Sequence, residues 1–306
     1  MIRRQVGNEY WLIAQDDHAH LAGDLARHLG NDRFSSPSSQ SAIIGIAMHD
    51  SGWPLHDDAP MLNTDGQPLD VFESPRELAL KVWEESARRA AAQDDYAGLL
   101  VSLHSLALCV YATSHPSASA AQSRWNLSDP RARFEVNRFQ HNMIELQEAL
   151  RQRLGMRTDR PLTHGLAETS TTDPKEQRLT FDFRLLQAMD TISLGICCTT
   201  PPFLQVPQVL ARPAATTPIT LRLHRVGDEL LVDPWPFGHD RIPVQIPFRR
   251  LMAQRFADAT SFRQAYRAAA VEHFPSVVRR GQVPVVCSPA AAEKSQAGIR
   301  CPDGQV

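Results

Sequence analysis

The sequence has almost no net charge and few cysteines. Its 306 residues include 32 basic and 34 acidic side chains, for a formal net charge of -2, so no global field favours nucleic acid or an anionic membrane as a partner. The five cysteines are odd in number and lack CxxC spacing, which argues against a disulfide framework and against a zinc knuckle. Cys109, Cys197 and Cys198 lie on apolar helical faces and are expected to be small core residues.

Long apolar segments are also missing. The first twenty residues contain no apolar core of the signal-peptide type, and no later run is expected to span a bilayer. We therefore expect a soluble, cytoplasmic protein without a nucleic-acid or membrane partner. The sequence makes no prediction of the oligomeric state.

Six segments show the apolar periodicity of helices: residues 11–30, 42–50, 75–93, 94–113, 130–154 and 174–198. No strand is expected before residue 200. Beyond it, ITLRLHRVGDELLVDPWPF alternates around a Gly-Asp turn and predicts a β-hairpin. DRIPVQIPF and QVPVVCS predict two more strands, on either side of a helix near Ser261 to Glu272.

The predicted fold class is therefore mainly α, an HD-type helical bundle with a small C-terminal β-rich unit. Residues 1–200 are expected to form the helical domain and residues 201–288 a β-hairpin/α unit packed on it. Residues 289–306 are expected to be a disordered tail. The segment 51–75 is rich in Pro, Gly and Asp, and its length and polarity suit a loop that lines or covers a site.

The apolar run IIGIAMHDSGW ends in adjacent His49 and Asp50. Both side chains are costly to carry out of water unless they are paired, shifted in pKa or bound to a metal. A buried segment that delivers such a pair therefore predicts further polar groups at the same place.

Three other helices place a polar side chain on an apolar face. His18 falls on the same stripe as the leucines that follow it, and His104 lies on a face that is otherwise entirely apolar. Asp190 stands in the middle of an apolar stripe. His141 is less clear, because it shares its side of the helix with Glu145 and other polar residues.

Imidazole nitrogens and carboxylate oxygens together are the ligands of Zn, Mn, Fe or Ni. A single buried histidine has a simpler explanation, a core side chain satisfied by a backbone carbonyl. An inward aspartate is harder to explain, because an unpaired buried carboxylate should neutralise or find a cation. Polar groups on several helices of a bundle are typical of a metal cage. We therefore predict a metal centre with ligands from His18, His49, Asp50, His104, His141 and Asp190.

The order of these residues resembles the HD-domain superfamily of metal-dependent phosphohydrolases and their oxygenase relatives. That order is a lone histidine, an adjacent His-Asp, later histidines and a final aspartate. The strings QDDHAHLAGDLA, HDSGWPLHDDAP and FDFRLLQAMDTISL more closely resemble an uncharacterised bacterial family catalogued as a domain of unknown function (DUF3891). The Gly-Tyr-Pro signature of the cyclic-dinucleotide branch is missing from the sequence.

The superfamily resemblance implies that His18, His49, Asp50 and Asp190 hold a first metal ion, with Asp50 as a catalytic residue. His104 and His141 would help to hold a second ion. The expected cofactor is thus one or two divalent transition-metal ions (Fe, Mn, Zn or Ni). We expect metal-dependent hydrolysis of a small phosphoester or nucleotide. A di-iron oxygenase and a non-catalytic binding module remain as alternatives.

Substrate contacts are predicted for Trp53 and Asp57, which follow the His-Asp pair, and for Lys81 and Arg124, which would bind an anion. Trp53 can equally well cap the bundle, and exposed basic side chains are more often solvated surface groups. The expected partner is a small, phosphorylated substrate.

Overall fold

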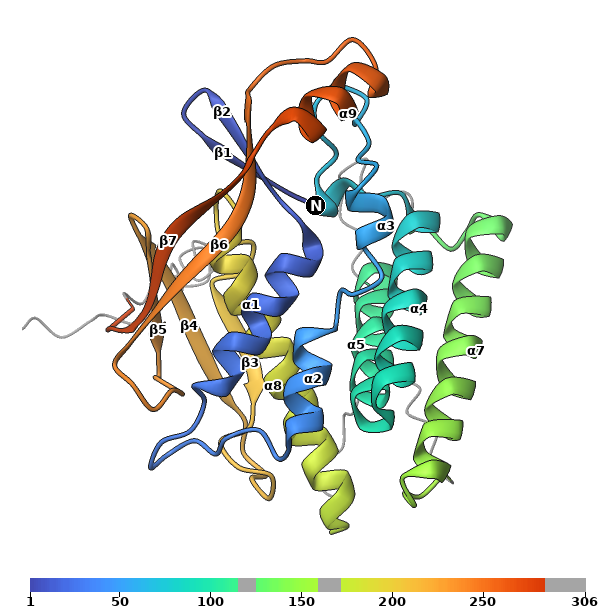
Figure 1. The fold of residues 1–306 in the computed structure, drawn as a ribbon. Coiled ribbons are helices and arrows are strands. Elements are labelled where there is room, and N and C mark those ends of the chain that lie inside the picture. The colour runs from blue at the N-terminus through green and yellow to red at the C-terminus, as the bar shows by residue number, and fades with distance from the viewer. Residues whose placement is uncertain (115–124, 159–171, 284–306) are drawn as a thin grey trace, which may run out of the picture.

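The computed structural model describes residues 1–114, 125–158 and 172–283. A seven-stranded mixed sheet forms one side of the molecule, and the helices are stacked away from it (Figure 1). The strand order is β1-β2-β6-β7-β5-β4-β3. Adjacent strands are antiparallel except β5 and β7, which are parallel.

The strands come from both ends of the chain. β1 and β2 form a hairpin around Gly7, whose φ of 57° lies in the left-handed region that favours glycine. β2 then pairs with β6, near the other end of the chain. The strands are β1 (Ile2–Val6), β2 (Glu9–Ile13), β3 (Gln205–Val209), β4 (Ile219–Val226), β5 (Glu229–Asp233), β6 (Arg241–Met252) and β7 (Val271–Arg280).

The helices form successive layers beside the sheet. α1 and α8 pack on the strands, α2 packs on α1, α5 and α8, and α5 is in turn covered by α4 and α7 (Figure 1). The α-helices are α1 (Gln15–Arg27), α2 (Gln40–Ala47), α3 (Pro54–Asp57), α4 (Arg76–Gln93), α5 (Asp95–Ser114), α7 (Pro130–Arg153), α8 (Pro174–Cys197) and α9 (Ala259–Ala268), and η1 (Val71–Glu73) is a short 3₁₀ helix.

Side-chain caps define where several of these helices begin. The side chain of Ser39 accepts a hydrogen bond from the backbone N–H of Ala42 at the start of α2. Asp129 and Asp173 cap α7 and α8 in the same way, and each is followed by a proline at the first helical position. Proline is tolerated there because its missing N–H would have no partner within the helix.

The sheet corrects the fold class expected from the sequence. The mainly α prediction with a small C-terminal β unit is wrong, because seven strands form one sheet and two of them occupy residues 2–13, where no strand was expected. The segments IRRQV and EYWLI flank a Gly-Asn turn, which was the local signal for a hairpin. The last strand in the described residues is β7. The predicted strand QVPVVCS lies mostly outside the described residues, and the predicted tail lies wholly outside them.

α5 is the one helix in the described ranges with the length and hydropathy to cross a membrane, and the sequence analysis did not single it out. Most of it is buried in the protein, among α2, α4, α7 and α8. Its central place in the core accounts for its apolar composition.

A buried carboxylate fastens the loop before α2 to α5 and α8. Asp182 on α8 accepts hydrogen bonds from the backbone N–H of Ser38 (2.9 Å), from the Ser38 hydroxyl and from the Tyr96 hydroxyl (2.8 Å). Burial raises the pKa of Asp182, and these donors oppose that effect. The network fixes the start of α2 relative to the two longer helices.

Candidate metal centre

Four segments bring inward polar side chains to one place between the helices. α1 carries His18, the turn after α2 carries His49 and Asp50, α5 carries His104 and α8 carries Asp190. The exposed fraction of each side chain is between 1% and 14%. We call these five residues the His-Asp cluster.

Two glycines allow the helices of the cluster to approach closely. A Cβ atom at Gly23 of α1 would lie 2.5 Å from the Cβ of Ala47 in α2, which is closer than two carbon atoms can pack. A Cβ atom at Gly45 of α2 would lie 3.2 Å from the Cα of Ala97 in α5. Because glycine has no side chain, α2 fits between α1 and α5 and delivers its C-terminal turn to the cluster.

The donor atoms have the separations expected for ligands of one ion. His18 Nε2 lies 3.0 Å from Asp50 Oδ2 and 3.8 Å from Asp190 Oδ1. His49 Nε2 lies 3.9 Å from the same oxygen of Asp50 and 3.4 Å from the same oxygen of Asp190. With metal–ligand bonds of about 2.0–2.2 Å, two ligands of one ion are roughly 3–4 Å apart. His18, His49 and Asp190 each offer one ligand atom, and these three atoms lie within 4.8 Å of one another.

The partners of the Nδ1 atoms determine which nitrogen of each ring faces the centre. His49 Nδ1 lies 2.8 Å from the carbonyl oxygen of Ile46, which can only accept a hydrogen bond. His18 Nδ1 lies 2.7 Å from Ser193 Oγ, and the Ser193 hydroxyl donates its own proton to the backbone carbonyl of Asp190. Both Nδ1 atoms are therefore donors, and in each neutral ring Nε2 carries the lone pair.

These lone pairs face carboxylate oxygens, which are also acceptors. Two acceptors 3.0 Å apart, as His18 Nε2 and Asp50 Oδ2 are, require a cation between them, either a proton or a metal ion. His49 Nε2 is buried and forms no hydrogen bond within the described residues, since its contact with Asp190 lacks hydrogen-bond geometry. A proton satisfies one nitrogen–oxygen pair, whereas a metal ion can contact ligand atoms of His18, His49 and Asp190 together. Asp50 adjoins this group through His18. The residues present therefore fit a metal ion.

The charges in the cluster are strongly coupled. Burial disfavours the ionised carboxylates, but the hydrogen bond of His18 to Asp50, the close contact of His49 with Asp190 and the charges of the imidazoles outweigh it and lower the pKa of both Asp50 and Asp190. Burial also opposes protonation of His49, yet Asp190 and Asp50 raise its pKa to about 9. At His104 burial dominates and lowers the pKa to about 4. The centre thus favours one extra positive charge near His49.

His104 approaches Asp190 from another side. Its Nε2 lies 3.5 Å from Asp190 Oδ2, the oxygen that does not face His18 and His49. Its ring meets His49 edge-on, with the centroids 5.3 Å apart, and its Nδ1 forms no hydrogen bond within the described residues. His104 can therefore orient the Asp190 carboxylate or contribute a ligand to a second ion.

Two of the predicted site residues, His141 and Asp57, do not belong to the His-Asp cluster. The structure does not bring His141 into the cluster: its side chain is 70% exposed, and its Nε2 lies 3.1 Å from Glu145 one turn along α7. Asp57 is buried, and it accepts hydrogen bonds from the amino group of Met1 (2.8 Å) and from the backbone N–H of Gln15 (2.7 Å). Asp57 therefore joins the start of β1 and the start of α1 to α3.

The other residues predicted to contact substrate, Trp53, Lys81 and Arg124, lie outside the His-Asp cluster or outside the described residues. Trp53 is 3% exposed and stands immediately before α3, with an Nε1 that has no hydrogen-bond partner within the described residues. Lys81 is exposed on α4 and lines a cleft whose lining contains no residue of the His-Asp cluster. Arg124 lies outside the described residues.

The structure adds residues that the sequence analysis did not identify. Ser193 orients His18 through a hydrogen bond. The sequence could have indicated this role, because Ser193 follows Asp190 by three residues and so lies on the same side of α8. The turn that follows Asp50 is held by α4, since Arg89 donates to the Ser51 carbonyl (3.1 Å) and Ser86 Oγ accepts from the Gly52 N–H (2.8 Å). No pattern in the sequence pointed to the last two contacts.

Comparisons with known proteins place the chain in a family but assign it no activity. No curated protein matches the sequence. No solved structure matches it either. A family model described as "Protein of unknown function (DUF3891)" matches residues 1–253, which is most of the chain. The protein therefore belongs to this family.

Proposed function

We propose that the His-Asp cluster holds a divalent transition-metal ion and that the protein is a metal-dependent hydrolase of a small phosphoester or nucleotide. The observation that carries the proposal is the convergence of two imidazole lone pairs and two carboxylate oxygens at ligand spacing. The order of the ligands along the chain, which resembles that of the HD-domain superfamily, supports the same chemistry.

The ligands of the ion would be His18, His49, Asp50 and Asp190. An ion in this position would lower the pKa of a bound water and polarise a phosphoryl oxygen. Asp50 faces His18 through Oδ2, and its Oδ1 accepts no hydrogen bond within the described residues. Oδ1 is therefore the atom best placed to accept a proton from the attacking water.

The surrounding residues would position the reactants and limit the access of water. Ser193 and the Ile46 carbonyl hold His18 and His49 with Nε2 toward the centre. The Asp190 side chain is 14% exposed, against 1% for His18 and His49. Substrate is therefore expected to approach past Asp190.

A single ion is better supported than two. Of the two imidazoles expected to hold a second ion, His104 adjoins Asp190 and His141 is exposed on α7. The di-iron oxygenase alternative depends on the second ion and so has weaker support than hydrolysis.

The test is elemental analysis of protein purified without chelator, combined with turnover of p-nitrophenyl phosphate. We expect about one transition-metal ion per chain, and loss of most of it in His49→Ala. His141→Ala is the matched control and should keep its metal, because its side chain is exposed. Asp50→Asn should lower kcat by a factor of about 10² to 10⁴. Stoichiometric metal without turnover of any phosphoester would favour the binding module, and wild-type protein without metal would contradict the proposal.

A further inference from the structure

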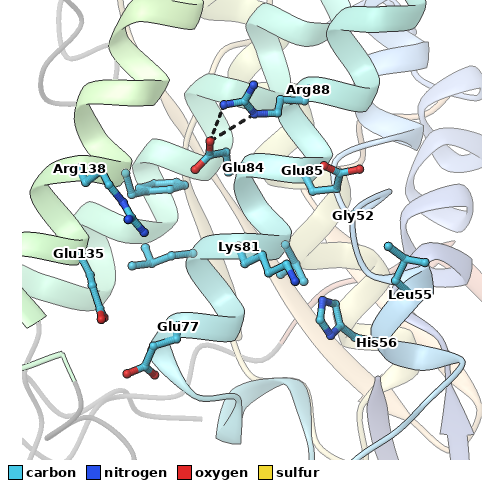
Figure 2. Close-up of a pocket in the computed structure, with 13 residues that line it drawn as sticks. Gly52, Leu55, His56, Glu77, Lys81, Glu84, Glu85, Arg88, Glu135 and Arg138 are labelled. Atoms are coloured by element: carbon cyan, nitrogen blue, oxygen red, sulfur yellow. Dashed lines mark hydrogen bonds and ion pairs between the residues drawn. The ribbon is translucent and has the colours of Figure 1, made fainter.

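A cleft between α3, α4 and α7 lies beside the segment that follows His49 and Asp50 (Figure 2). Its volume is about 500 Å³, which is in the range of small-molecule binding sites. Gly52 and His56 form part of its wall, but its lining, all within the described residues, includes no member of the His-Asp cluster. The cleft is therefore a separate candidate site.

The inner surface of the cleft is apolar. Val82 is fully buried, and Leu80 and Phe139 are 7% and 2% exposed. Leu55, at the edge of the same cleft, is 65% exposed. An exposed leucine beside a buried apolar surface favours an occupant with an apolar body, which would remove that leucine from water.

The acidic side chains of the lining already have basic partners. Each of the four glutamates forms an ion pair with at least one arginine on α4 or α7, and their charges are thereby largely neutralised. The nitrogen–oxygen distances are 2.6–3.1 Å, for the pairs Glu77–Arg76, Glu84–Arg88, Glu85–Arg89, Glu135–Arg76 and Glu135–Arg131.

Two cations in the same lining have no ion-pair partner within the described part of the chain. Lys81 extends from α4 toward His56, and Arg138 extends into the cleft from α7 (Figure 2). The Arg138 guanidinium lies 5.9 Å from the ring centroid of Phe134, a contact that leaves its N–H donors free. Burial, and then the charge of Lys81, lower the pKa of His56, so this imidazole is neutral at pH 7. The positive charge of the cleft therefore comes from Lys81 and Arg138.

We propose that this cleft binds a small organic anion, with its acidic group held by one of the two cations, Lys81 or Arg138, and its apolar body against Leu55, Leu80 and Phe139. A charged group bound by basic side chains forms strong, charge-assisted hydrogen bonds. The inference is independent of the proposed hydrolase activity, because none of these residues belongs to the His-Asp cluster.

The test is calorimetric titration of the full chain, in EDTA, with phenyl phosphate, benzoate and neutral benzamide. We expect saturable binding of at least one of the two anions, and the tighter one identifies the acidic group as phosphate or carboxylate. Benzamide should bind about tenfold more weakly or not at all. One of the two variants, Lys81→Met or Arg138→Met, should weaken anion binding by about tenfold, which identifies the cation that holds the acidic group. Arg133→Met is the matched control, because Arg133 is exposed on α7 outside the lining, and should leave binding unchanged.

Folding of the variants can be checked by thermal melts, since all three replaced side chains are exposed. The inference is overturned if neither anion binds the wild-type protein, or if binding is unaffected by both Lys81→Met and Arg138→Met. Anion binding that occurs only without EDTA and disappears in His49→Ala would place the ligand at the metal centre. That result would overturn this inference while supporting the proposed function.

Discussion

Asp190→Asn is the substitution that isolates the charge of the His-Asp cluster. Asparagine has nearly the same shape as aspartate, so the change creates no cavity and removes only the carboxylate charge. Asp190 Oδ1 lies 3.4 Å from His49 Nε2 and 3.8 Å from His18 Nε2. Asp190 Oδ2 lies 3.5 Å from His104 Nε2. In protein freed of metal by EDTA, the charge of Asp190 favours a proton on His49.

The loss of folding stability caused by Asp190→Asn can be calculated from these contacts. The gross attraction of two unit charges 3.4 Å apart is about 5 kcal/mol at an effective dielectric constant of about 20. The net loss is smaller, because His49 can release its proton when Asp190 is replaced. The pKa of about 9 for His49 limits the loss at pH 7 to about 3 kcal/mol, which agrees with the cost of breaking a buried ion pair. The melting temperature should fall by roughly 6–12 °C.

The pH dependence has a definite sign. The pKa of His49 is raised from 6.5 to about 9 in the folded protein, so the stabilisation is complete below pH 6.5 and is lost as the pH rises through 9. Thermal melts in EDTA should therefore show a difference between wild type and Asp190→Asn that shrinks from pH 7 to pH 10. Asp24→Asn on the exposed face of α1 is the control and should change stability by less than about 0.5 kcal/mol. Equal melting temperatures at pH 7, or a loss independent of pH, would refute the reasoning.

Three further outcomes are expected. A transition-metal ion added to EDTA-treated protein at about 100 times its dissociation constant should stabilise it by about 2.7 kcal/mol, and no shift with Zn, Mn, Fe or Ni in scanning fluorimetry would count against the centre. Asp182→Ala should cost about 2–4 kcal/mol, because it leaves the Ser38 and Tyr96 hydroxyls without their acceptor, and an unchanged urea midpoint would contradict this role. Burial raises the pKa of Cys109 and Cys197 to about 12, so neither thiol should react with a disulfide reagent at pH 8 before unfolding. Mass spectrometry locates any label, and early labelling of either residue would contradict their burial.

Helical periodicity was sufficient to identify most of the inward polar groups. His18, His104 and Asp190 each interrupt an apolar stripe with a spacing of three or four residues. The structure buries His18 and His104 and leaves the Asp190 side chain 14% exposed. His141 shares its side of α7 with Glu145, and the structure exposes both. The presence of Glu145 beside His141 therefore marked this side of α7 as a solvent-exposed face.

The β4–β5 hairpin and the strand β6 were predicted from the sequence. The rest of the sheet could not be predicted in the same way, because its pairings join distant parts of the chain. β2 is stabilised by β6, and the alternation of burial along β1 and β2 covers only five residues each. β7 has charged residues near both ends and a proline within it, whereas the apolar string that follows it looked more like a strand. At β7 the pairing with β5 and β6 outweighed a weak local propensity.

The central claim is that one metal ion is bound by the His-Asp cluster, and X-ray absorption spectroscopy of the purified protein tests it most directly. The account predicts a metal with two imidazole nitrogens and carboxylate oxygens at about 2.0–2.2 Å, and loss of the imidazole signal in His49→Ala. A metal surrounded only by water or sulfur, or a spectrum that His49→Ala leaves unchanged, would contradict it.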